Sequence, residues 1–118
     1  MREEEKFMDN FITPANHFGF KAKKLEEEIK GTISDCSVAY IEPNGGGPEP
    51  SHTHIHDHFF IVTEGTATIK MGEEKFIVNK DESIIIPGSI IHSIWNETDK
   101  QLKMIGITIQ PEVLLFSH

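Results

Sequence analysis

Four histidines lie within the eight residues SHTHIHDH at positions 51–58, whereas the whole chain of 118 residues has seven. Because side chains alternate along a strand with a period of two, an extended conformation would project all four from one face. Neutral imidazoles that converge on one point form a good site for a divalent transition metal. The alternative is a solvated histidine-rich run that binds metal loosely without any function.

A further histidine, His92, follows the apolar segment IIIPGSII at positions 84–91. In such a context an imidazole is costly to bury unless it has a partner, so we interpret His92 as a second part of the same site. Imidazole ligands admit Fe, Mn, Zn, Ni, Co and Cu, and the sequence leaves the identity of the ion open. His17 and His118 have no comparable neighbours.

The length and charge of the chain restrict its partners. A chain of 118 residues predicts one domain that removes roughly two thirds of its unfolded surface from water. The net charge of −8 repels phosphate backbones and anionic lipids, so we expect no nucleic-acid or membrane partner. We expect a cytoplasmic protein, because no signal-peptide pattern opens the chain, and its single cysteine, Cys36, cannot form an internal disulfide.

From Ser37 onward, short segments rich in Ile, Val, Phe and Thr alternate with Gly, Asn, Asp and Pro. This spacing is typical of an all-β sandwich or barrel. The segments are, in order, SVAYIEP, NGGGPEP, HFFIVTEG, TATIKMGEE, KFIVNKDE, SIIIPGS, HSIWNETD and LKMIGITIQP.

The segments that flank the barrel have a different composition. Residues 1–20 carry four of the eight phenylalanines, so we expect an N-terminal arm that packs on the barrel or on a partner subunit. The barrel is predicted over residues 21–111 and a C-terminal tail over 112–118. The stretch KAKKLEEEIK fits a helical turn or a strand pair equally well.

The histidines stand in two patterns that resemble the two motifs of the cupin superfamily. The first pattern consists of Gly46, His52, His54, His58 and Gly65, with His58 where the family usually has glutamate. The second consists of Pro87, Ser89, His92 and Asn96, with Ser89 in place of a glycine and Asp81 in place of the leading glycine. The resemblance spans about residues 37–111 and implies a single-domain double-stranded β-helix, a jelly-roll-like barrel.

The resemblance also implies that His52, His54 and His92 bind one metal ion, with His58 filling the glutamate position as a fourth ligand. Four neutral ligands leave the centre formally +2, which favours anionic ligands such as enolates and carboxylates. A three-histidine set without His58 is the alternative. His56 does not occupy a ligand position of the motif, so we predict it at the rim of the site.

If His58 and His92 face inward, the alternation of side chains along a strand places Phe60 and Ile94 inside as well, and we include them in the predicted substrate pocket. His56 and Tyr40 are further predicted pocket residues. Apolar walls suit a small aromatic, enolic or alkene substrate better than a sugar. Trp95 has the opposite parity, and an outward tryptophan on a small barrel favours a homodimer.

Three functions follow as hypotheses. The leading one is a metal-dependent oxygenase or dioxygenase-type enzyme that acts on a small substrate. The second is a non-redox isomerase or lyase, for which Tyr40, Glu64 and His56 are the candidate bases. The third is a cupin that binds a small ligand without turnover, because one architecture hosts many functions.

Overall fold

The computed structural model describes residues 10–26 and 29–112, and within these ranges the chain forms strands and no helix. The prediction of a single all-β domain is therefore confirmed. No described helix has the length and apolar character needed to cross a membrane. The strands are β1 (Thr32–Ile41), β2 (Gly46–His52), β3 (Asp57–Glu64), β4 (Thr66–Met71), β5 (Glu74–Asn79), β6 (Ser83–Ile86), β7 (His92–Trp95) and β8 (Leu102–Gln110).

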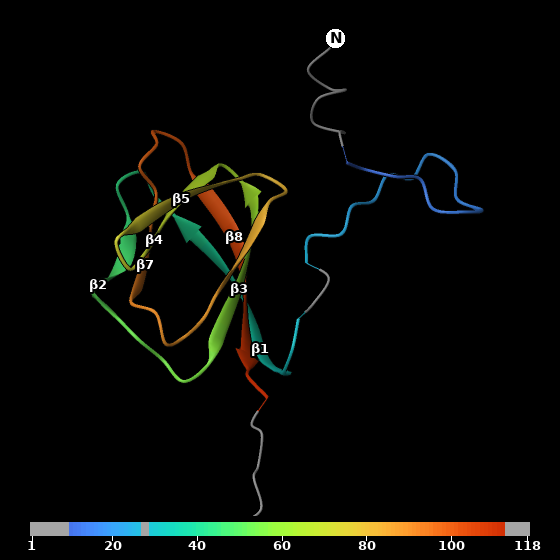
Figure 1. Ribbon diagram of the computed structural model, residues 1–118. Helices are drawn as coiled ribbons and strands as arrows, with labels where there is room; N and C mark the ends of the chain where they lie inside the picture. Colours follow the sequence, from blue (N-terminus) through green and yellow to red (C-terminus); the bar gives the residue numbers. More distant parts are fainter. Residues whose placement is uncertain (1–9, 27–28, 113–118) are drawn as a thin grey trace, which may run out of the picture.

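The strands form two four-stranded sheets, in the orders β1-β8-β3-β6 and β2-β7-β4-β5 (Figure 1). Every paired strand is antiparallel. β2 and β7 pair in one sheet and β3 lies in the other, and the loop after β2 and the start of β7 meet β3 at one end of the barrel. This arrangement brings the two histidine segments together although about 40 residues separate them.

The core lies between the two sheets. Its buried side chains come from both sheets and are Val62, Ala67, Ile69, Val78, Ile86, Leu102 and Met104. In β3, Phe60 packs against this core with the same parity as Val62, as the alternation predicts. His58 lies two residues before Phe60 and therefore projects from the same inner face of the sheet.

β2 forms from residues with low strand propensity, including Gly46, Gly47 and Pro48. It pairs with β7, and a register shift separates the Gly47–Ile94 pair from the His52–His92 pair. A side chain at Gly46 would overlap the indole ring of Trp95, so this close approach requires glycine. Packing against β7, rather than local propensity, therefore makes this segment a strand.

The histidine run does not form one strand, so the alternation of four imidazoles on one face that an extended run would give does not occur. β2 ends at His52, residues 53–56 form a loop, and β3 begins at Asp57. The loop is anchored to the segment before β7, because the His54 amide donates to the Gly88 carbonyl at 2.8 Å. The chain turns here, and tertiary contacts rather than parity decide where each imidazole points.

Residues 10–26, called the arm from here on, comprise the described part of the arm predicted over residues 1–20 and six residues of the range predicted as barrel, and they contain turns and no helix. Ile12 and Ala22 form an antiparallel bridge, so the arm folds back on itself as a hairpin. Its base touches the barrel, where the Ser83 hydroxyl donates to the Leu25 carbonyl at 3.2 Å. The tip of the hairpin stands away from the barrel (Figure 1), whereas Ile12 and Ala22 line a cavity together with Ile77 of β5. Residues 27 and 28 of the ambiguous stretch, and Phe7 of the predicted arm, lie outside the described residues.

Asn96, the last residue of the second motif, is a structural anchor and is fully buried. Its amide nitrogen donates to the carbonyls of Ile41 and Lys100, and its side-chain oxygen accepts from the amide and hydroxyl of Thr98.

We expect Asn96→Ala to lower the free energy of unfolding by about 3 kcal/mol, because buried carbonyls lose their donors. Chemical denaturation measures this loss, and the exposed Asn79→Ala should change stability by about 0.5 kcal/mol or less. Equal effects of the two variants would contradict the anchoring role.

Candidate metal centre

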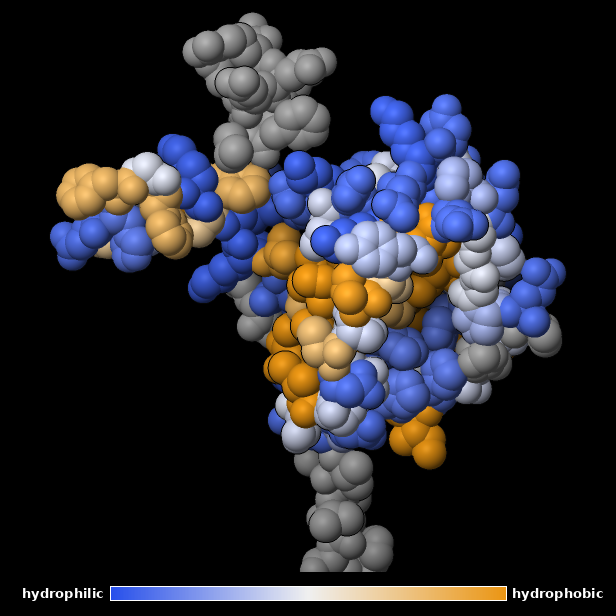
Figure 2. All heavy atoms as spheres, turned by 180° about the vertical axis from the view of Figure 1, so that it is seen from behind, coloured by the Kyte–Doolittle hydropathy of each residue, from blue (hydrophilic) through white to orange (hydrophobic). Residues whose placement is uncertain are grey.

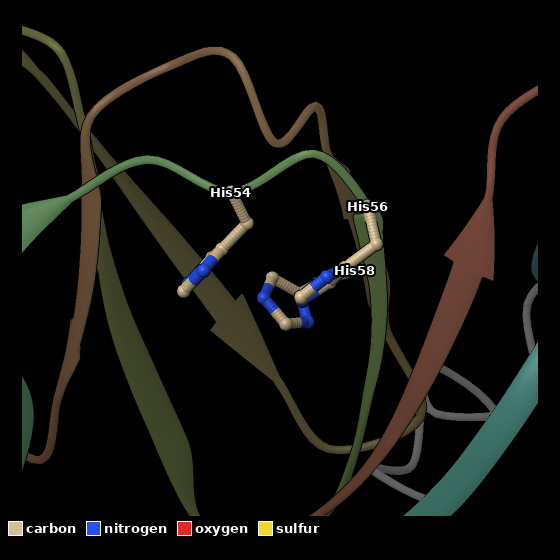
Figure 3. Close-up of side chains that lie close together, drawn as sticks. All are labelled: His54, His56 and His58. Carbon is tan, nitrogen blue, oxygen red and sulfur yellow. The ribbon is translucent and has the colours of Figure 1, made fainter.

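Histidines from three parts of the fold gather at one end of the barrel. His54 and His56 lie in the loop between β2 and β3, His58 lies in β3, and His92 is the first residue of β7. Figure 3 shows His54, His56 and His58 with their rings grouped beside the same loop. One ring nitrogen from each of these three residues lies within 4.8 Å of the others.

The ring of His92 lies beside this group. Its centroid lies 5.3 Å from that of His54 and 5.3 Å from that of His58. The rings of His54, His58 and His92 are tilted or perpendicular to one another, with interplanar angles of 86°, 54° and 71°. His54 and His56 instead stack nearly parallel, with an interplanar angle of 14° and a centroid distance of 4.7 Å.

His92 is held in place by its own segment. Its side chain is only 2% exposed, and its Nδ1 lies 2.7 Å from the carbonyl oxygen of Ile90. This contact selects the tautomer that carries the proton on Nδ1, so Nε2 keeps its lone pair. Metal-binding histidines commonly donate their second N–H to a carbonyl in this way. His92 therefore has the local environment of a ligand.

His52 is the remaining predicted ligand. Its backbone pairs with that of His92 across β2 and β7, so it begins at the correct end of the barrel. Its side chain lies outside the described residues. The predicted set of four ligands stays a prediction, and the structure describes three of its members close together.

Gly88 supports the histidine loop, and sequence reasoning missed it. A side chain at this position would collide with the carbonyl oxygens of His54 and His56. The Gly88 amide donates to the Asp57 carboxylate at 2.9 Å, and its carbonyl accepts from His54. The close approach of the histidine loop therefore requires glycine at position 88. Ser89, which stands where the second cupin motif has its glycine, is exposed. The PG dipeptide at 87–88 was the available signal.

The pKa of His58 is lowered from its ordinary value of 6.5 to about 4. Burial is the largest cause because it penalises the charged imidazolium, and repulsion from His56, His92 and His54 adds to it. The Asp35 carboxylate acts in the opposite direction. His58 is consequently neutral at pH 7 and its lone pair is available to a metal ion.

This pKa predicts how pH affects the stability of the metal-free protein. Between pH 6.5 and about 4, the unfolded chain takes up a proton at His58 that the folded chain does not. The free energy of unfolding should therefore fall as pH decreases through this window. Solvent screening of the half-buried ring limits the contribution of His58 to about 1–2 kcal/mol.

The measurement is denaturation of chelator-treated protein at several pH values, compared with His58→Gln. The wild-type protein should lose more stability than the variant between pH 6.5 and 4. Parallel curves for the two proteins would show that His58 is protonated equally in the folded and unfolded states.

The surroundings of His58 are apolar on one side and polar on the other. Phe60 stacks against its ring at 5.1 Å, and Ile86 lies opposite it in β6. On the other side, Thr108 of β8 pairs with both His58 and Asp35, so all three share the inner face of the sheet. Sequence reasoning missed Thr108 and Asp35, because only the register of three paired strands brings them into one row.

The other predicted pocket residues and candidate bases lie at several separate positions in the barrel. Ile94 pairs with Ile69 and packs against the core. Tyr40 lies on the outer face of its sheet and is 58% exposed, with the Lys103 Nζ 5.3 Å from its ring centroid. Glu64 is exposed at the opposite end of β3 from His58. Of the three candidate bases, only His56 lies with the metal-site histidines.

Comparisons with known proteins identify relatives of this chain. Residues 38–108, more than half of the chain, match the sequence model of the family described as Cupin domain. A 67-residue stretch is 33% identical to mannose-1-phosphate guanylyltransferase of Salmonella muenchen and covers 57% of this chain. The chain spans only 14% of the length of that curated relative.

Solved structures share the fold. The plu4264 protein of Photorhabdus luminescens is 27% identical, with a TM-score of 0.57 over 63% of this chain and 60% of that one. A sugar phosphate isomerase of Silicibacter pomeroyi, from a cupin superfamily, is 21% identical, with a TM-score of 0.57 over 63% of this chain and 48% of that one. At this lower identity the likeness concerns the fold alone.

Proposed function

The chain belongs to the cupin domain family, and we propose that it is a metal-dependent enzyme of the oxygenase type. In this proposal one divalent transition metal is bound by His54, His58 and His92, with His52 as the fourth ligand, and a small enolic or aromatic substrate binds beside it. The observation that carries the proposal is the convergence of imidazole rings from three separate segments, together with the depressed pKa of His58.

The ring orientations favour this set of ligands over one that includes His56. Donor atoms bound to one ion at about 2.1 Å must approach it from well-separated directions. The crossed rings of His54, His58 and His92 suit this requirement. The rings of His54 and His56 lie nearly parallel, so we assign His56 to the rim of the site, although one of its nitrogens lies within 4.8 Å of nitrogens of His54 and His58.

The ion would supply Lewis acidity and, if it is Fe, Mn or Cu, redox chemistry. Because every proposed ligand is neutral, the site retains its full positive charge and attracts an anionic oxygen of the substrate. Phe60, which stacks on the ring of His58, would contact a flat apolar portion of the substrate. The hydroxyl of Thr108 would hydrogen-bond a polar group on the opposite side.

Metal analysis followed by oxygen uptake tests the proposal. Untagged protein, purified without added metal or chelator, should contain about one Fe, Mn or Cu ion per chain. A panel of small enolic and aromatic acids should then include a compound that drives oxygen consumption in proportion to the metal content. Protein that binds no metal on titration would refute the metal site, and loaded protein that consumes no oxygen with the panel would refute the oxygenase.

A second candidate function is a non-redox isomerase acting on a sugar phosphate. Two observations favour a sugar phosphate as the substrate: the similarity to a mannose-1-phosphate guanylyltransferase, whose name includes a sugar phosphate, and the polar row that contains Asp35 and Thr108. Asp35 or His56 would act as the general base next to the metal. Turnover of a sugar phosphate under strict exclusion of oxygen, and its loss in Asp35→Asn, would select this function over the oxygenase.

A further inference from the structure

The outer face of the sheet β2-β7-β4-β5 carries the only tryptophan of the chain, Trp95. Ile94 packs against the core, so the side chain of its neighbour Trp95 lies on the outer face of β7. The indole N–H donates to the Ser93 hydroxyl at 2.9 Å. The ring also lies so close to Gly46 that a side chain at that position would overlap it. These two contacts fix the ring on the sheet.

A cavity of about 340 Å³ opens beside this ring. Sites for small molecules commonly have volumes of about 300–1,000 Å³. The described residues that line the cavity are Asn44, Glu49, Lys70, Trp95, Asn96 and Glu97. Apart from Trp95 they are all polar, so the cavity combines one aromatic surface with several hydrogen-bonding groups.

The surroundings of the cavity are also hydrophilic. β2 and β7 lie on the side of the barrel away from the arm (Figure 1). Figure 2 shows apolar side chains gathered on the part of the barrel beside the arm, whereas the side away from the arm carries mostly hydrophilic side chains. Surfaces that bind proteins or membranes are broad apolar patches. A single aromatic ring among polar groups instead suits a small polar ligand that has one apolar side.

The charges around the cavity nearly cancel. Lys70 lies beside the aromatic ring, with its Nζ 5.6 Å from the ring centroid of Trp95. Its positive charge is opposed by the carboxylate of Glu49. The second carboxylate, that of Glu97, is paired with the Nζ of Lys75 at 3.6 Å. A neutral ligand fits this balance better than an anion or a cation does.

The loop that forms one wall of the cavity is held by backbone hydrogen bonds. The Asn44 amide donates to the Asn96 carbonyl at 2.8 Å, and the Asn96 amide donates to the Gly45 carbonyl at 2.9 Å. Asn44 has a φ of 68°, a conformation that asparagine tolerates. Because this wall and the Trp95 ring are already fixed, a ligand would pay little to order them.

We propose that this cavity binds a neutral sugar in its pyranose form. One side of a pyranose ring presents C–H groups that pack on an aromatic surface, here that of Trp95. Its hydroxyls donate and accept hydrogen bonds, for which Lys70 provides donors, Glu49 provides acceptors and the Asn44 amide provides both. The cavity lies on the outer face of its sheet, so this ligand is separate from the substrate of the metal centre.

Tryptophan fluorescence of the full chain tests the proposal, because Trp95 is the only tryptophan. The probes are the methyl pyranosides of glucose, mannose and galactose. A methyl glycoside cannot open to the free aldehyde, so it is not a substrate for isomerisation at the metal centre. At least one probe should change the emission of Trp95 saturably, with a Kd in the millimolar range that is expected of a shallow site.

Two variants connect the binding to the cavity. Lys70→Met keeps an unbranched side chain beside the ring but removes the charge, and Asn44→Gly permits the same backbone conformation without the amide. Each should weaken binding about tenfold, the loss that corresponds to one hydrogen bond from or to the ligand. Lys103→Met is the matched control, because Lys103 lies 5.3 Å from the ring centroid of Tyr40 in the other sheet. It should bind the sugar as the wild-type protein does.

Circular dichroism checks that each variant is folded. The absence of a saturable change with all three glycosides would overturn the proposal. Unchanged affinity in both Lys70→Met and Asn44→Gly, or an equal loss in Lys103→Met, would overturn it as well. None of these measurements depends on bound metal or on turnover, so their outcome is separate from that of the proposed enzymatic function.

Discussion

Substitution of His58 or His92 by alanine is expected to abolish stoichiometric metal binding. Each variant removes one of the imidazoles whose rings meet at about 5 Å. Loss of an outer-shell partner alone typically lowers metal affinity 10–100-fold, so loss of a direct ligand should exceed this range. Elemental analysis after dialysis, and titration with Zn²⁺ or Co²⁺, measure the effect.

Two control variants make this result specific. His17→Ala removes an exposed histidine of the arm and should retain one ion per chain. His56→Ala removes the stacked ring at the proposed rim and should retain the ion with only moderately reduced affinity. If His56→Ala loses the metal while His92→Ala keeps it, the ligands are His54, His56 and His58, and the proposed set is wrong.

Gly88→Ala is expected to damage the site without altering any histidine. The added methyl group would collide with two carbonyl oxygens of the histidine loop, and the loop would have to move away from β7. Overpacking of this kind costs about 1–3 kcal/mol, which corresponds to several degrees in Tm for a domain of this size. Because His54 and His56 move with the loop, metal affinity should fall at least tenfold.

Gly72→Asn is the control for this prediction. Gly72 has positive φ but open space around its Cα, and asparagine tolerates that conformation. The control should keep both its metal content and, within about 1 kcal/mol, its stability. A Gly88→Ala protein with normal metal affinity would show that the loop does not depend on this contact.

The spacing of the histidines and the strand-like segments determined much of this protein in advance. Alternating apolar residues and closely spaced turns indicate an all-β domain, because one face of each strand must be buried. The order of the two histidine patterns indicated the family. The position of His92 after an apolar segment indicated a buried imidazole with a partner, and its ring lies next to His54 and His58.

The tertiary structure decided how the histidine run is arranged. Parity alone would place four imidazoles in one row, but a loop interrupts the run at residues 53–56. That loop follows the backbone of Gly88, which is 34 residues away from His54 in the chain. No local pattern encodes such a contact, because it depends on β7 lying beside β2.

The register of the paired strands decided which residues lie next to His58 and which face outward. It places Asp35 and Thr108 in the same row as His58, and it places Tyr40 on the outer face. The sequence gives the alternation within each strand, but the alignment between strands is set by the burial of all of them around one core. The types of side chain that could bind a metal were therefore evident from the sequence. The residues that surround each of them in space are determined only when the two sheets pack against each other.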